Sequence, residues 1–314
     1  MRTAQANSRR DRLSLSVAAG RAGYGRVVDH LVLMKPRVMS LVVFTGAIGY
    51  LLAPAKFDAL NMVAALAAMA AAAGACGALN MWWDADIDAQ MSRTAARPIP
   101  RGAVDPRQAL TLGLVLTVVS LAAMALRVNL LAAALLAATI VIYIPFYTMG
   151  IKRRTPQNIV WGGAAGALPP VIGWAAATHS LSLASLSLFL IIFLWTPPHF
   201  WSLALKRSAD YERVGVPMLP NVAGPVETCR QILIYSVLLV ASSYFPLAIA
   251  HVGWVYGLIA TALNGAFLLR AIKLYGLRNG PEAEQRKIAF GLFGFSIAYL
   301  FAIFLALGVS ALAF

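Results

Sequence analysis

Long apolar runs separated by short polar segments dominate this chain. Nine such runs cover residues 38–54, 60–83, 108–126, 129–149, 158–177, 183–205, 230–250, 252–272 and 288–312. A helix needs about 20 residues to cross the hydrocarbon core of a bilayer, and most of these runs are long enough. The strands of a membrane barrel would be about half that length and would alternate in polarity, which these runs do not. The pattern predicts an all-α integral membrane protein with a bundle of about nine transmembrane helices.

Composition supports a membrane protein and argues against a nucleic-acid-binding one. The chain is 60% hydrophobic and only 12% charged, with 12 acidic residues in 314, whereas soluble domains have about 25% charged residues. So few acids cannot solvate the surface of a soluble protein of this length. The net charge of +14 could suggest nucleic acid, but the runs leave no soluble module to bind it, so we expect no such partner.

The basic residues predict an orientation in the membrane. If the N-terminus is cytoplasmic, alternate loops on that side collect 24 of the 26 Lys and Arg residues, and only Lys56 and Arg127 fall on the other side. Cytoplasmic loops carry an excess of Lys and Arg. We therefore expect a multi-pass protein of the cell inner membrane, with its C-terminus on the opposite side.

The first 28 residues differ from the rest of the chain. They contain six arginines and no long apolar core, which is typical of a basic cytoplasmic tail rather than a signal peptide. We predict a flexible tail over 1–28, followed by a single transmembrane domain over 29–314.

An amide and two carboxylates stand where the second apolar run ends. Asn80, Asp84 and Asp88 are four residues apart, so on a helix they share one face, while Asp86 points elsewhere. We call these three residues the acidic stripe. Carboxylates at the edge of a low-dielectric region are costly unless a cation neutralises them. A solvated helix end would explain a generic acidic pair, but here the stripe begins inside the apolar run.

The arginines that follow the stripe favour a more specific hypothesis. Arg93, Arg97 and Arg101 lie in the next turn, where an anionic group would need positive charge. Mg²⁺ takes hard oxygen ligands and commonly shares them with substrate phosphates, and arginine binds phosphate oxygens in pairs. The sequence therefore predicts a site for Mg²⁺ and a diphosphate.

Two further polar segments lie on the same predicted side. The first is a basic loop formed by Lys152, Arg153 and Arg154, which the excess of cytoplasmic charge would explain without any function. The second spans residues 194–220.

In this second segment, Pro197 and Pro198 are expected to break or kink a helix just before His199, which would suit the lining of a cavity. A histidine at membrane depth is either structural or functional. Asp210 is the best candidate for a third metal-facing carboxylate.

These stretches resemble a known family. Residues 80–98, with Asn80, Asp84 and Asp88 followed by Arg93 and Arg97, resemble the first signature of the UbiA-type intramembrane prenyltransferases. More narrowly, three stretches resemble its protohaem IX farnesyltransferase (haem O synthase) branch: NMWWDADIDAQMSRTAARPIPRG, IKRRTPQNIVWGGAAGALPPVIGW, and LWTPPHFWSLAL followed by DYERVGVPMLP. Unlike many members of the wider family, this chain lacks a second D-x-x-x-D, because Asp210 has no acid four residues away on either side.

The resemblance implies a fold, a reaction and a set of site residues. It implies helices around a central cavity open at the cytoplasmic face, farnesyl diphosphate and haem B as substrates, haem O as product and Mg²⁺ as cofactor. A downstream haem-modifying enzyme or an oxidase would be a reasonable partner. By position, the implied catalytic residues are Asn80, Asp84, Asp88 and Asp210, of which the three aspartates face the metal. The implied diphosphate-binding residues are Arg93, Arg97, Lys152, Arg153, Arg154 and Lys206, and His199 is the implied haem contact.

Three other functions compete with this one. A UbiA-type prenyltransferase acting on an aromatic quinone precursor would use the same stripe with another acceptor. A cation-coupled transporter would explain membrane-buried acids, but transporters are commonly built from two matching halves, and no internal duplication is evident. A non-catalytic haem-binding membrane protein would leave the stripe and the arginines without a purpose.

Overall fold

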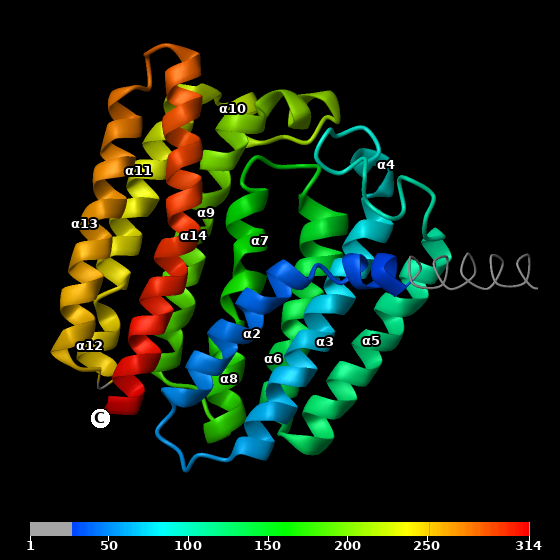
Figure 1. The fold of residues 1–314 in the computed structure, drawn as a ribbon, viewed down its shortest axis with the longest axis vertical. Helices are drawn as coiled ribbons and strands as arrows, with labels where there is room; N and C mark the ends of the chain where they lie inside the picture. The colour runs from blue at the N-terminus through cyan, green and yellow to red at the C-terminus, as the bar shows by residue number, and fades with distance from the viewer. Residues whose placement is uncertain (1–26, 251, 314) are drawn as a thin grey trace, which may run out of the picture.

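The structure, a computed structural model, describes residues 27–250 and 252–313, and within these ranges it is helical without strands. Residues 1–26 of the predicted tail lie outside the described residues. The helices (Figure 1) are α2 Pro36–Leu51, α3 Ala59–Trp83, α4 Ala85–Asp88, α5 Pro106–Arg127, α6 Leu130–Val141, η1 Ile142–Ile151, α7 Asn158–Ala167, α8 Pro169–Thr178, α9 Leu183–Arg213, α10 Leu219–Val222, α11 Gly224–Ser242, α12 Phe245–Ile249, α13 Trp254–Gly276 and α14 Glu282–Ala313.

The predicted number of membrane spans is confirmed. In the described part of the chain, eight helical segments are long and apolar enough to cross a membrane. A ninth is formed if the helix Val27–Leu33 and α2, bent by 53° relative to each other, count as one broken span. Three spans are built from two consecutive helices each: α6 with η1, α7 with α8, and α11 with α12.

Polar residues in the loops start several of these helices. Asp58 and Asn129 accept hydrogen bonds from the backbone N–H groups of Asn61 and Ala132. Asp105 begins α5 with a capping box. Such side chains satisfy backbone donors that the first helical turn leaves free. The capping residues therefore fix the positions at which α3, α5 and α6 begin.

The bundle has two distinct ends. The short helices α4 and α10 and the turn between α13 and α14 lie at one end, and α12 and the C-terminus lie at the other (Figure 1). The first end gathers the predicted cytoplasmic segments. It is also the end at which the acidic stripe lies.

Helix α9 is not broken at its two prolines, contrary to the expectation from sequence. Pro197 and Pro198 lie inside the continuous α9, and the residue inside it with non-helical dihedral angles is Arg207 (φ −119°, ψ 18°). Proline has no backbone N–H, so each proline removes one hydrogen bond from a helix. Here the hydroxyl of Ser202 also donates to the carbonyl of Pro198 at 2.6 Å. Helix α9 therefore runs from its membrane-spanning part to the kink at Arg207 without interruption.

A π-helix separates α6 from the basic loop. Segment η1 contains Pro145 and has the wider π-helical turn, a geometry found frequently at functional sites. Thr148 in η1 is fully buried, and its hydroxyl donates to the carbonyl of Tyr143. This turn places Thr148 beside the acidic stripe.

Close helix contact at α2 and α8 depends on glycine. A Cβ at Gly49 would lie 2.0 Å from the carbonyl oxygen of Pro170, and one at Gly173 would lie 2.0 Å from that of Gly46. In membranes, small residues allow helix backbones to approach and pack closely. Glycine at these positions therefore permits α8 to lie directly against α2.

Substitution Gly49→Ala tests this contact. Because the added methyl group meets backbone atoms that cannot rotate away, we expect a loss of about 2 kcal/mol or more of stability. The apparent melting temperature in detergent should fall by about 5 °C. Gly166→Ala is the control, because its Cβ would meet nothing within 4 Å. Equal melting temperatures for the two variants would contradict the argument.

Candidate active site

The acidic stripe is buried where α3 ends. Asn80 lies in the last turns of α3, Asp84 follows its final residue, and Asp88 ends α4. Their exposed fractions are 4%, 0% and 3%. The amide of Asn80 donates to Asp84 Oδ2 at 2.8 Å and to the hydroxyl of Thr148 at 3.2 Å. The stripe is thus a connected buried polar group and not a solvated helix end.

Cations from separate segments neutralise the two buried carboxylates. Lys152 at the end of η1 pairs with Asp84, and Arg97 pairs with Asp88. The ammonium of Lys35, which precedes α2, donates to Asn80 Oδ1 at 2.6 Å. Buried carboxylates are tolerated when they are paired in this way. The structure therefore brings together Asn80, Asp84, Asp88, Arg97 and Lys152 of the predicted site.

Arg153 connects the stripe to the exposed Asp86. Its guanidinium makes two hydrogen bonds of 2.7 Å to the Asp86 carboxylate and lies 3.5 Å from Asp84 Oδ1. The bond from Arg153 lowers the pKa of the Asp86 carboxyl, and the same bond raises the pKa of Arg153. Because the pKa of Asp86 is lowered on folding, this pair stabilises the protein at neutral pH and is lost only as the pH falls through that lowered value. Arg153 therefore holds the basic loop against α4.

Three predicted bases do not contact the stripe. Arg93 and Arg154 are exposed. Lys206 is also exposed, and its ammonium lies 6.0 Å from the centre of the Phe290 ring. These residues add positive charge to the predicted cytoplasmic end without a defined partner in the stripe.

Asp210 anchors the loop after α4 to helix α9. The hydroxyl of Ser92 donates to Asp210 Oδ2 at 2.8 Å. The other carboxylate oxygen, Oδ1, has no hydrogen bond within the described residues, and its nearest cation is Arg213 at 3.8 Å. Asp210 is 8% exposed. One oxygen of a buried carboxylate therefore remains available for a further ligand.

His199 lies between aromatic rings of α9 and α14. Its ring stacks on Trp195 at 4.2 Å and on Phe293 at 4.7 Å between centroids. Its Nδ1 is 2.7 Å from the hydroxyl oxygen of Ser296, and that hydroxyl donates to the carbonyl of Phe293. With Ser296 donating to Phe293, the tautomer that matches this arrangement has the proton on His199 Nδ1 and the lone pair on Nε2.

Lys35, Thr148 and Ser92 also contact the site, although they were not predicted from the sequence. Lys35 alone had a usable signal, because it is a charged residue directly before Pro36 at the start of an apolar run. A residue before proline is biased away from helix, so a break in the chain could have been expected there. Thr148 and Ser92 contact the site through long-range packing, for which the sequence offers no pattern.

The donor set of the stripe fits Mg²⁺. Asp84 and Asp88 supply buried carboxylate oxygens, which are the hard ligands that Mg²⁺ prefers. Within the described residues, no three His, Cys, Asp or Glu side chains are grouped to form a complete cage. Mg²⁺ commonly binds through one or two carboxylates and completes its shell with water and substrate phosphates, so the two aspartates suffice. Asp210 does not form a three-acid group with them.

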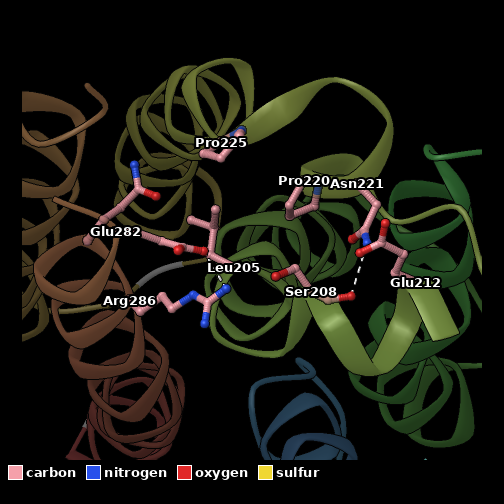
Figure 2. A pocket seen from close by; sticks show the side chains of 9 residues that line it. Leu205, Ser208, Glu212, Pro220, Asn221, Pro225, Glu282 and Arg286 are labelled. Atoms are coloured by element: carbon pink, nitrogen blue, oxygen red, sulfur yellow. Dashed lines mark hydrogen bonds and ion pairs between the residues drawn. The ribbon is translucent and has the colours of Figure 1, made fainter. Parts of the chain in front are cut away.

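A separate polar pocket lies at the same end of the bundle. Figure 2 shows it between α9, α10, α11 and α14. Its volume is about 260 Å³. Glu282 and Arg286 form an ion pair at its edge, and the amide of Asn221 donates to the carbonyl of Ser208. None of its lining residues belongs to the predicted site.

Comparison with known proteins identifies the relatives of this chain. The sequence profile of the UbiA prenyltransferase family matches residues 42–297. The protoheme IX farnesyltransferase of Rhodopseudomonas palustris (strain BisB5) is 52% identical over 303 residues, which are 96% of each chain. That of Azorhizobium caulinodans is 52% identical over 92% of this chain and 94% of its own.

A solved structure shows the same fold at low sequence identity. A UbiA homolog from Archaeoglobus fulgidus bound to GPP and Mg²⁺ is 15% identical and covers 91% of this chain and 100% of its own, with a TM-score of 0.64. Together with the nearly full-length relatives, this likeness leads to one conclusion. The chain belongs to the UbiA prenyltransferase family, and its relatives at about half sequence identity are protoheme IX farnesyltransferases.

Proposed function

We propose that this protein transfers the farnesyl group of farnesyl diphosphate to a vinyl group of haem B, giving haem O. The observation that carries the proposal is the 52% identity to protoheme IX farnesyltransferases over nearly the whole chain. The buried acidic stripe and its cations supply the chemistry that such a reaction needs. An aromatic quinone precursor as acceptor has no comparable support.

The stripe would bind the diphosphate end of the substrate. Asp84 and Asp88 would hold Mg²⁺, which supplies positive charge that weakens the bond to the leaving diphosphate. Arg97, Lys152 and Arg153 already lie beside these carboxylates. Once the metal neutralises the aspartates, these cations can bind phosphate oxygens instead.

The proposed transfer reaction consumes one water molecule and releases diphosphate and one proton. The bond between farnesyl C1 and the diphosphate breaks, and diphosphate leaves with the electron pair. The terminal vinyl carbon of haem attacks C1, and water adds to the neighbouring carbon and loses a proton. The product carries a hydroxyethylfarnesyl group. Bulk water must be excluded, because it would capture the allylic cation first.

His199 would bind the haem iron through Nε2. With Nδ1 donating to Ser296, the lone pair of Nε2 would be available, and neutral imidazole is a common metal ligand. Trp195 and Phe293 fix the orientation of the ring on both faces. The haem would then be held at its centre, with its vinyl groups at the edge.

The location and partners complete the proposal. The chain would lie in the cell inner membrane with its N-terminus in the cytoplasm and its C-terminus on the opposite side, because the basic loops gather at one end. The product would pass to a downstream haem-modifying enzyme or an oxidase. No nucleic acid is involved.

The reaction is tested with purified protein, haem B, farnesyl diphosphate and Mg²⁺, followed by mass analysis of the extracted haem. We expect the haem to gain one farnesyl group and one hydroxyl group. Asp84→Ala should lower turnover by about a hundredfold or more, because the metal loses a buried ligand. Glu284→Ala, at an exposed carboxylate of α14, is the control. An unchanged haem mass with folded wild-type protein would refute the function.

The proposal that Asp210 binds Mg²⁺ through Oδ1, apart from the pair formed by Asp84 and Asp88, is tested against its role as a loop anchor. We expect Asp210→Asn to lower turnover by about a hundredfold and to raise the Mg²⁺ concentration needed for half-maximal rate. Ser92→Ala removes only the hydrogen bond to Oδ2 and should cost less than about tenfold. Equal losses in both variants, with an unchanged Mg²⁺ requirement, would assign Asp210 to anchoring alone.

The His199–iron bond is tested by absorption spectroscopy of the haem-loaded protein. We expect His199→Ala to shift the main haem absorption band and added imidazole to restore it, because imidazole replaces the missing ligand. His179→Asn is the matched control, since His179 is exposed and ends α8 with a left-handed backbone that asparagine tolerates. An identical spectrum in His199→Ala would rule out ligation by this residue.

A further inference from the structure

Lys35 occupies a specialised backbone position. It lies between the helix Val27–Leu33 and α2, where the chain bends by 53°. Its dihedral angles are φ 53° and ψ 60°, in the left-handed region that residues other than glycine rarely adopt. Pro36 follows and disfavours a right-handed helical conformation at Lys35. The bend therefore directs this lysine away from the course of either helix.

Two glycines of α3 allow the bend to approach the stripe. A Cβ at Gly77 would lie 2.7 Å from the carbonyl oxygen of Leu33, and one at Gly74 would lie 2.7 Å from Met34 Cε. The contact at Gly77 is with backbone, which cannot move aside. Gly77 precedes Asn80 by three residues on α3, so the close approach brings Lys35 to the start of the acidic stripe.

The ammonium of Lys35 reaches a neutral partner among charged neighbours. Its Nζ is 2.6 Å from Asn80 Oδ1, and the side chain is partly buried. Asp84, Asp88, Arg97 and Lys152 all act on it electrostatically. Lys152 and Arg97 each have a carboxylate partner of their own, whereas within the described residues no carboxylate is in ion-pair distance of Lys35. Lys35 therefore has no carboxylate partner among the described residues, and its one hydrogen bond there is to Asn80.

We propose that Lys35 is a further diphosphate-binding residue, which donates to a phosphate oxygen of the prenyl diphosphate. This inference rests on the proposed function, since it names one more contact of the same site. An ammonium has three donors, so Lys35 keeps its bond to Asn80 while it binds the phosphate. It acts as a compact point charge and stabilises the negative charge that develops on the departing diphosphate.

The direct test measures binding of inorganic diphosphate with Mg²⁺ to the full-length protein. Lys35→Gln keeps a donor for Asn80 but removes the charge, and should weaken diphosphate binding about tenfold or more. Lys35→Arg keeps the charge and should stay within about threefold of wild type. Arg37→Gln, at an exposed base two residues further along, is the control and should bind as wild type does.

Steady-state kinetics give a second measurement on the same variants. Lys35→Gln should raise the KM for farnesyl diphosphate about tenfold, with the KM for haem B within about twofold of wild type. If Lys35→Gln does not fold, acetylation of Lys35 in the wild-type protein replaces it, and we expect Mg²⁺ with diphosphate to slow this acetylation. Folded Lys35→Gln with unchanged diphosphate affinity, or acetylation unaffected by diphosphate, would overturn the inference.

The experiments distinguish a failure of the proposed function from a failure of the Lys35 assignment. If wild-type protein produces no farnesylated haem but Lys35→Gln still loses diphosphate affinity, the proposed function is wrong and Lys35 remains a diphosphate ligand. If wild-type protein produces haem O and Lys35→Gln binds diphosphate normally, the function holds and the assignment of Lys35 is wrong.

Discussion

The burial of Asp84 and Asp88 at the end of α3 is the constraint on which the rest of this structure depends. An unpaired carboxylate costs several kcal/mol when it is taken out of water. Arg97 in the loop after α4 pairs with Asp88, and Lys152 after η1 pairs with Asp84. Lys35 before α2 donates to the neighbouring amide of Asn80. The two carboxylates thereby hold the predicted cytoplasmic ends of several spans together.

The same arrangement prepares the site for an exchange of partners. Two buried carboxylates lie among three basic side chains, two of which pair with them. With Mg²⁺ held by the aspartates, Arg97 and Lys152 would be available to another anion. Positive charge would then be in excess at the proposed diphosphate site. Such preorganised charge acts without rearrangement during the reaction. The stabilising ion pairs and the proposed binding groups are therefore the same side chains.

Sequence predicted what depends on local spacing and missed what depends on packing. Asn80, Asp84 and Asp88 were recognisable because helical periodicity places them on one face. The contact of Lys35 with Asn80 spans 45 residues and that of Ser92 with Asp210 spans 118, so no local pattern encodes them. The prolines of α9 misled for a related reason, because local rules predict the loss of a helical hydrogen bond but not that a helix packed against its neighbours stays continuous there.

Helix α9 carries two of the predicted site residues, His199 and Asp210, at different depths in the bundle. His199 and Asp210 are eleven residues apart, which corresponds to about 16 Å along a regular helix, although the backbone bends at Arg207. The charged half lies at the predicted cytoplasmic end, and His199 lies deeper, between aromatic rings. The vinyl groups of a haem are at its periphery, so a haem bound through its iron reacts at a distance from its ligand. A histidine deeper in the bundle than the proposed diphosphate site would therefore suit transfer to the haem edge better than a histidine within that site.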